Sequence, residues 1–391
     1  MRKTFQYKAV TSKTTSVNAD RCLILCQQLY NLCLEQRIMV YNQRKITLSK
    51  YDQDKELPEL KEAFPEFKIV GSQVLQDVTD RVSKAFQGFF RRLETKKGKA
   101  GFPRFKSRDR YDSFTLKQAG WSLEGKYLHI KGIGTFKLRL SRPIEGRIKT
   151  ITLRRDSRDD WYVSFSCDDV PAREYPEPEE ERTGIDVNIS NYCTDSDPCS
   201  EAVENPRFYL KAQKQLRKQQ RKVSRRKKGS NRRKKAVKQV ARTHSKVSRQ
   251  RKDFAHKWSR YYILKYYEIH IENLQIANMM RNHNLAKHIA DVSWGMFFEF
   301  LSYKAAEAGR ILIKVKPHGS SQECSFCHAI VPKTLAMRIH NCPECGLILP
   351  RDKNSANIIE EREGVIVTPQ VGPVRPLRRK RDSAECAPIR G

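Results

Sequence analysis

The clearest chemical signal in the chain is a set of four cysteines near its C-terminus. They form two Cys-x-x-Cys pairs, Cys324/Cys327 and Cys342/Cys345, separated by fourteen residues. Each pair directs two thiolates toward one ion and the loop between them returns the second pair to it, so the spacing predicts one tetrahedral zinc site. Four sulfur ligands leave no open coordination position, which favours a structural zinc ion over a catalytic one. Disulfide bonds are the alternative for the same cysteines.

Three acidic residues suggest a second metal site. Asp186 lies inside the apolar segment 182–190, and Glu272 lies in the segment 267–274, where a strand pattern ends. Asp352 follows the second cysteine pair by seven residues. An acid in a buried strand is costly unless it is paired or binds a metal. Three carboxylates from separate segments can hold two Mg²⁺ ions about 4 Å apart, as in two-metal phosphodiester hydrolysis. An ion pair with an arginine is the alternative for each acid taken alone.

The composition indicates a polyanionic partner. Lysine and arginine number 77 and aspartate and glutamate 44, which gives a formal net charge of +33. Such an excess is typical of proteins that bind nucleic acid, although a ribosomal-type or merely soluble basic protein would also fit. No run of about 18 apolar residues predicts a membrane span. The N-terminus lacks the apolar core of a signal peptide, and the other cysteines lack framework spacing, so we expect a cytoplasmic protein.

A large share of the charge lies in one tract. Residues 211–252 contain 20 lysines and arginines and no acidic residue. Apolar residues recur in this tract at roughly helical spacing, and Gly229-Ser230 is typical of a break, so we expect two helices that present basic side chains to phosphates. A solvated face or a disordered arm is the alternative. The basic residues that we expect to contact nucleic acid are Arg221, Arg225, Arg226, Lys227, Lys228, Arg232 and Arg233.

The elements that must position these residues fall into two groups. The first half of the chain has helical apolar spacing over 18–45 and 74–90, and then alternates with period two over 108–170, which predicts a small β domain. Residues 171–181 read as a linker. The second half predicts strands at 182–190, 267–274 and 311–315 and an amphipathic helix at 294–309.

Several motifs together resemble the TnpB family, the transposon-encoded RNA-guided endonucleases regarded as ancestors of type V CRISPR effectors. The resemblance extends to about residue 365. It rests on Ala85-Phe-Gln-Gly-Phe-Phe90, Gly101-Phe-Pro-Arg-Phe-Lys106, Gly184-Ile-Asp186, Asn205-Pro-Arg-Phe208, Ser224-Arg-Arg-Lys-Lys-Gly-Ser230, Ile271-Glu-Asn-Leu274, the paired cysteines and Arg351-Asp-Lys-Asn354.

The resemblance implies an α/β multidomain protein with a RuvC-like nuclease of RNase H fold. The nuclease domain would comprise residues 179–318 and 349–365, interrupted by a zinc ribbon at 319–348 that binds target nucleic acid. A β-barrel-like wedge domain would comprise 1–12 and 108–178, with a helical recognition domain at 13–107 inserted into it. Beyond the resemblance, residues 366–391 are rich in proline, glycine and basic residues, a composition that predicts a basic, disordered tail.

The same resemblance implies a function and its residues. Asp186, Glu272 and Asp352 would form the catalytic triad and bind two Mg²⁺ ions, while the four cysteines would hold one structural Zn²⁺. The partners would be an element-derived guide RNA and target double-stranded DNA next to a short flanking motif, bound by a monomeric ribonucleoprotein in a prokaryotic, nucleoid-associated setting. Gln76 matches a position that contacts the flanking motif, and an amide suits an adenine edge.

We also expect Arg104 and Lys106 of the Gly-Phe-Pro-Arg-Phe-Lys motif to contact nucleic acid. Two residues depart from the family pattern: Asn188 stands where glycine is usual, and Pro350 stands where an acid is common. An intact triad predicts cleavage, and the departures allow a slower enzyme. The alternatives are an RNA-guided repressor without nuclease activity, a zinc-ribbon DNA-binding protein without a guide, and, least favoured, a transposase.

Overall fold

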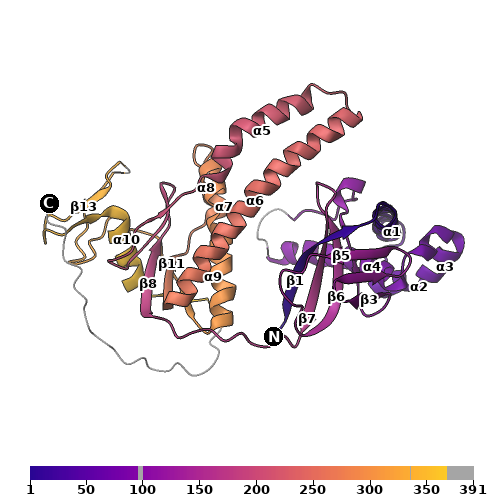
Figure 1. The fold of residues 1–391 in the computed structure, drawn as a ribbon, viewed down its shortest axis with the longest axis horizontal. Helices are drawn as coiled ribbons and strands as arrows, with labels where there is room; N and C mark the ends of the chain where they lie inside the picture. The colour runs from indigo at the N-terminus through magenta and orange to yellow at the C-terminus, as the bar shows by residue number, and fades with distance from the viewer. Residues whose placement is uncertain (96–99, 335, 368–391) are drawn as a thin grey trace. The chain divides into compact units, whose positions relative to one another are not determined.

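The computed structural model describes residues 1–95, 100–334 and 336–367. The chain forms two compact units, Met1–Pro171 and Ala172–Gly391, drawn in Figure 1. Among the described helices, none has both the length and the apolar character needed to cross a membrane.

The first unit is built on one antiparallel sheet of seven strands in the order β2-β6-β7-β1-β5-β4-β3. In β7, alternate residues from Trp161 to Cys167 are buried, the period of a strand with one face against a core. Since β2 and β3 are the two edge strands and do not pair with each other, closure of this sheet into a barrel stays a prediction. The strands are β1 (Lys3–Thr11), β2 (Ser113–Leu116), β3 (Trp121–Glu124), β4 (Tyr127–Ile130), β5 (Gly134–Leu138), β6 (Arg147–Arg155) and β7 (Trp161–Asp168).

The helices of this unit lie in the chain between β1 and β2, as the sequence predicts. Ser12 caps the first of them, because its side chain accepts the Thr15 N–H. Helices and sheet share one hydrophobic cluster, so the division into recognition and wedge domains stays a prediction. The helices are α1 (Lys13–Arg44), α2 (Lys50–Lys55), α3 (Leu57–Ala63), α4 (Ser72–Thr95) and the 3₁₀ turns η1 (Pro65–Ile69) and η2 (Arg108–Arg110).

The second unit is built on a mixed sheet in the order β10-β9-β8-β11-β12-β15. The pairs β8–β9 and β9–β10 are antiparallel, whereas β11 runs parallel to both β8 and β12. The carboxyl ends of β8, β11 and β12 therefore meet at one edge. The strands are β8 (Glu180–Asp186), β9 (Asn191–Asp195), β10 (Val203–Glu204), β11 (Tyr266–Glu272), β12 (Ile311–Val315) and β15 (Gly364–Ile366).

Two long helices form an antiparallel pair within this unit (Figure 1). They are α5 (Phe208–Ser224) and α6 (Asn231–Lys265), and the predicted break between them is confirmed, because Ser230 caps α6 by accepting the Arg233 N–H. The remaining helices are α7 (Ile276–Met279), α8 (Ala286–Val292), α9 (Trp294–Ala308) and α10 (Arg351–Glu361). A small hairpin of β13 (Ile339–Asn341) and β14 (Ile348–Pro350) carries the second cysteine pair in its loop and ends directly before α10.

Three predicted boundaries differ from the structure. The strand expected over 182–190 ends at Asp186, because the Asn188 side chain accepts the Asn191 N–H at 2.7 Å and closes a turn into β9. The first basic helix, expected to continue to the break at Gly229-Ser230, ends earlier, at Ser224. Of the tail expected to be disordered over 366–391, Ile366 belongs to β15, and residues 368–391 lie outside the described residues.

Candidate active site and metal centre

Asp186 and Glu272 end two neighbouring parallel strands. Ile185 on β8 pairs in register with Ile271 on β11, and the two acids are the next residues on each strand. Because both strands run in the same direction, their last residues lie side by side at the carboxyl edge of the sheet. Open α/β sheets bind ligands at this edge.

Asp352 reaches the same place from a helix. It lies in the first turn of α10, which packs on β8. The unpaired N–H groups at a helix N-terminus favour a negative charge there. The close approach depends on Gly184, since a Cβ at that position would lie 2.1 Å from the Ala356 carbonyl oxygen. Thus a strand glycine allows the helix to bring the third acid to the first two.

The three acids share an electrostatic environment. Burial raises the pKa of Asp186 well above its usual range, and the charges of Glu272 and Asp352 raise it further. Asn188 and Arg351 act in the opposite direction. Burial also raises the pKa of Glu272. Glu272 and Asp352 therefore oppose the ionisation of Asp186, a condition that a bound divalent cation relieves.

Two neutral side chains hold carboxylates in this cluster. The Asn188 amide donates to Asp352 at 3.0 Å, and its oxygen is already engaged with Asn191 N–H, which fixes the direction of the amide. The Ser320 hydroxyl donates to Glu272 at 2.7 Å. Two of the three acids are thus oriented by a hydrogen-bond donor.

The donor set of the cluster fits magnesium. Mg²⁺ prefers hard oxygen ligands and is held by carboxylates together with water and phosphate. Three partly or fully buried carboxylates supply such ligands. Among the described residues, no lysine or arginine forms an ion pair with any of the three. The residues that would hold Mg²⁺ are Asp186, Glu272 and Asp352.

The four cysteines form one compact sulfur cluster. Their Sγ atoms all lie within 4.8 Å of one another. Cys327 and Cys342 are 3.5 Å apart and Cys324 and Cys345 are 3.7 Å apart, measured between their Sγ atoms. Both distances far exceed a disulfide bond of about 2.05 Å. The backbone N–H of Cys345 helps to lower the pKa of Cys342 to about 7. A cluster of four thiols with a stabilised thiolate fits zinc.

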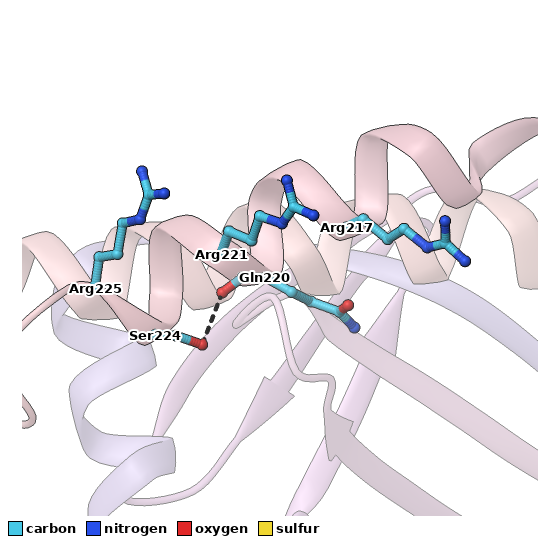
Figure 2. Close-up of a pocket in the computed structure, with 5 residues that line it drawn as sticks. All are labelled: Arg217, Gln220, Arg221, Ser224 and Arg225. Atoms are coloured by element: carbon cyan, nitrogen blue, oxygen red, sulfur yellow. Dashed lines mark hydrogen bonds between the residues drawn. The ribbon is translucent and has the colours of Figure 1, made fainter.

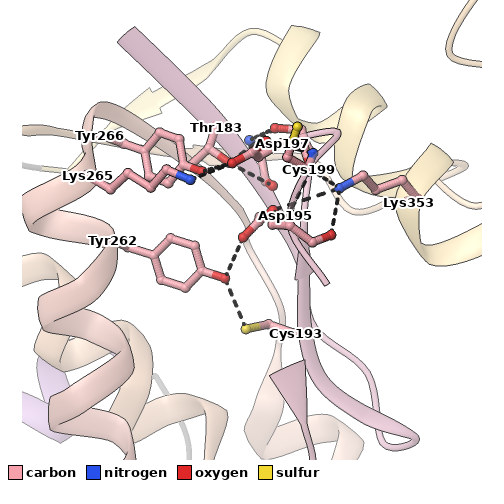
Figure 3. A network of polar contacts seen from close by, with 12 residues as sticks. Thr183, Cys193, Asp195, Asp197, Cys199, Tyr262, Lys265, Tyr266 and Lys353 are labelled. Carbon is pink, nitrogen blue, oxygen red and sulfur yellow. Dashed lines mark hydrogen bonds and ion pairs between the residues drawn. The ribbon is translucent and has the colours of Figure 1, made fainter. Parts of the chain in front are cut away.

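A polar network anchors the residue that follows Asp352 (Figure 3). The Lys353 ammonium donates to the backbone carbonyl of Asp197 and lies 4.0 Å from an Asp195 carboxylate oxygen. Tyr262 donates to Asp195 at 3.1 Å, and Lys265 pairs with Asp197 at 2.5 Å. The first turn of α10 is thereby tied to the end of β9 and to α6.

A row of arginines follows one face of α5. Arg217 and Arg221 on α5 and Arg225, the residue just after the helix, line a shallow surface pocket with Gln220 and Ser224 (Figure 2). Four-residue steps place successive arginines about 6 Å apart along the axis. Such a row can contact several phosphates of one nucleic-acid strand.

The other basic residues expected to bind nucleic acid differ in how free their side chains are. Lys227, Lys228 and Arg232 are exposed at the turn between α5 and α6. Arg226 donates to the Arg232 carbonyl at 2.5 Å, and Arg233 donates to the Val223 carbonyl at 2.7 Å. These two guanidinium groups stabilise the turn, so fewer of their N–H groups are available to contact phosphates.

The remaining predicted contact residues lie in the first unit. Gln76 is half-buried on α4, and Arg104 is exposed. The backbone of Lys106 is fixed to α1, because Asn31 and Gln27 both hydrogen-bond to it. The loop after α4 is thus held in place while the Arg104 side chain stays accessible.

Sequence reasoning missed several residues that shape the site. No sequence motif indicated that Ser320 hydrogen-bonds to Glu272 or that Gly184 packs closely against α10. Asn188 stood out only as a departure from the family pattern, although its side chain reaches Asp352. Arg217 could have been found from its four-residue spacing to Arg221.

Two family models match the chain. One, described as "Probable transposase", matches residues 164–283, and a second, the Cas12f1-like TNB domain, matches residues 294–359. The first match includes Asp186 and Glu272, and the second includes the four cysteines and Asp352.

Relatives and a solved structure extend the likeness to most of the chain. A Streptomyces pristinaespiralis protein named "Putative RNA-guided DNA endonuclease" is 31% identical over 92% of this chain and 89% of its own length. The Escherichia coli protein InsQ, of the same description, is 28% identical over 79% of each chain. A Cas12f1 structure solved with guide RNA and target DNA matches with a TM-score of 0.56 at 13% identity, covering 90% of this chain and 84% of that one. The chain belongs to the TnpB family.

Proposed function

We propose that this protein is an RNA-guided DNA endonuclease that depends on Mg²⁺. The observation that carries the proposal is the convergence of Asp186, Glu272 and Asp352 at one edge of the second sheet. The Streptomyces and Escherichia coli relatives are named for this activity. Family membership over nearly the whole chain supports the same function here.

The second unit would be a RuvC-like nuclease of RNase H type, comprising residues 179–318 and 349–365. Three antiparallel strands followed by two parallel ones, with acids at the ends of the first and fourth, support this assignment. Residues 319–348 would be the zinc ribbon that binds target nucleic acid, and the matched Cas12f1-like domain supports that role. The wedge and recognition domains would lie in the first unit.

The residues of the chain would act mainly by positioning. Bound Mg²⁺ would supply the activated water and stabilise the leaving 3′ oxygen. Asp186 and Glu272 would fix the ligand positions from the rigid strands, and Asp352 would complete them from α10. Asn188 and Ser320 would keep the carboxylates from turning away, since each donates a hydrogen bond to one of them.

The basic surface would bind guide RNA and the displaced or paired DNA. The arginine row of α5, Arg217, Arg221 and Arg225, would hold phosphates without reading bases. Base pairing by the guide would then provide most of the sequence specificity. Arg104 and Gln76 are further candidates for contacts, the latter with the flanking motif.

The experiment that tests this function begins with expression of the protein together with its native flanking DNA. We expect one discrete RNA to co-purify, with a constant part and a terminal segment that matches the flanking DNA. That ribonucleoprotein should cut matched double-stranded DNA in Mg²⁺. A heterogeneous RNA population that is lost in moderate salt would contradict guidance, and guided binding without cleavage would favour the repressor alternative.

A further inference from the structure

The segment that leads into the zinc ribbon contacts Glu272 and also α10, the helix that carries Asp352. Residues 316–325, here called the connecting segment, run from the end of β12 to the first cysteine pair. Within it, Ser320 is buried and donates to Glu272 at 2.7 Å. The segment that holds Cys324 therefore also orients the second acid.

Asn354 links the same segment to the helix of the third acid. Its side chain is fully buried, at 0% exposure, one turn from the start of α10 and two residues after Asp352. It accepts the Ser325 N–H at 2.9 Å and donates to the Glu323 carbonyl at 2.7 Å. These two backbone groups flank Cys324. A buried amide with both ends bonded resists displacement, because an unpaired polar group in the interior is costly.

A third contact joins the far end of α10 to the segment. Arg362, just after the helix, pairs with the Glu323 carboxylate at 2.7 Å. The same guanidinium donates to the carbonyls of Lys316 and His318 at 2.9 and 2.8 Å. Contacts at both ends of α10 leave the connecting segment and the helix little freedom to move independently.

We infer that the connecting segment couples the four-cysteine site to the acid cluster, with Ser320 and Asn354 as positioning residues for Glu272 and Asp352. Metal held by the four cysteines would fix Cys324 and its neighbours, and the two hydrogen bonds of the buried Asn354 amide would then fix α10 relative to them. Loss of the ribbon metal would therefore weaken divalent-cation binding at the acids. The inference rests on the proposed role of the three acids as metal ligands.

The test measures Mn²⁺ binding to the full-length protein by electron paramagnetic resonance, with Asp186→Ala defining the signal of the acid site. Four proteins form a cycle: the parent, Asn354→Ala, the ribbon variant Cys342→Ser, and the double variant. We expect each single change to weaken Mn²⁺ binding about 10-fold. Because both changes act through the same contacts, the double variant should bind Mn²⁺ no more weakly than the single variant that binds it less tightly. Independent effects that multiply would overturn the coupling.

Further variants keep the test decisive if Cys342→Ser unfolds the ribbon. Ser320→Ala and Asn354→Ala leave all four cysteines in place and should retain one zinc per chain. Their cleavage should need about 10-fold more Mg²⁺ for half-saturation and recover at high Mg²⁺. The matched control, Asn357→Ala, lies one turn along the same helix and should bind Mn²⁺ like the parent. Mn²⁺ binding unchanged in both variants would contradict the inference, whereas a parent that binds Mn²⁺ but leaves guided DNA uncut would count against the proposed function alone.

Discussion

Gly184 on β8 faces the carbonyl oxygen of Ala356 on α10 so closely that a Cβ would lie 2.1 Å away. The same Cβ would lie 2.5 Å from the Glu360 backbone nitrogen. Backbone atoms cannot turn aside as a flexible side chain can. Two residues further along β8 stands Asp186, and four residues before Ala356 stands Asp352. The distance between the two acids therefore depends on this contact.

A methyl group at Gly184 should damage both stability and activity. We expect Gly184→Ala to lower the free energy of unfolding by about 1–3 kcal/mol, the usual cost of overpacking, and to reduce cleavage by moving α10 from β8. Denaturant unfolding and single-turnover cleavage check this. The control is Gly88→Ala inside α4, where the nearest atom is an arginine side-chain nitrogen 3.6 Å away; this change should stabilise the helix by roughly 0.5–1 kcal/mol.

Removal of the Asn188 amide should release Asp352. Asn188→Ala loses the 3.0 Å hydrogen bond to that carboxylate, so we expect cleavage to fall about 10-fold and the Mg²⁺ requirement to rise. Asn188→Asp should be worse, because it adds a fourth negative charge to the cluster. A Mg²⁺ titration of the cleavage rate distinguishes them. Equal rates for all three proteins at every Mg²⁺ concentration would show that the amide is idle.

Loss of zinc should disable the ribbon while the rest of the protein remains folded. A chelator should extract one zinc per chain, and cleavage should fall even when Mg²⁺ is restored in excess, because small zinc-binding domains fold around their metal. Zinc release measured with a chromogenic indicator, beside cleavage, provides the check. Unchanged cleavage after complete zinc loss would mean that the ribbon is not needed for activity.

Substitution of the arginine row should weaken binding in a salt-dependent way. Each of Arg217→Ala, Arg221→Ala and Arg225→Ala that removes a phosphate contact should reduce the slope of log K against log salt by about 0.7–0.9. Gln220→Ala changes the same surface without changing its charge and should leave the slope unaltered. Fluorescence anisotropy at several salt concentrations measures the slope. Equal slopes for the arginine and glutamine variants would remove this face of α5 from the interface.

Much of the secondary structure of the second unit could be predicted, because the sequence patterns that indicate it lie within short segments of the chain. The strand that ends at Glu272 follows from apolar spacing and a polar end, and the break at Gly229-Ser230 follows from turn chemistry. The cysteine cluster follows from spacing alone, since a Cys-x-x-Cys turn has few other uses in such a context.

The contacts around the acids could not be predicted in the same way. Ser320 meets Glu272 across 48 residues of chain, and Asn188 meets Asp352 across 164. No sequence period or fixed spacing indicates either pair, because both contacts arise from how α10 and the connecting segment pack on the sheet. The early end of β8 likewise depends on one side-chain hydrogen bond, from Asn191 N–H to Asn188, which outweighs the apolar pattern of residues 187 and 189.

The most direct test of the proposed active site compares cleavage and guided DNA binding by Asp186→Ala, Glu272→Ala and Asp352→Ala with the triple variant. Because the three acids would act as one metal site, each single change should abolish cleavage and the triple change should cost no more. Guided DNA binding should persist in all four, since the residues proposed to contact phosphates lie elsewhere. Cleavage at the parent rate by any single variant would contradict the claim that these three carboxylates form the active site.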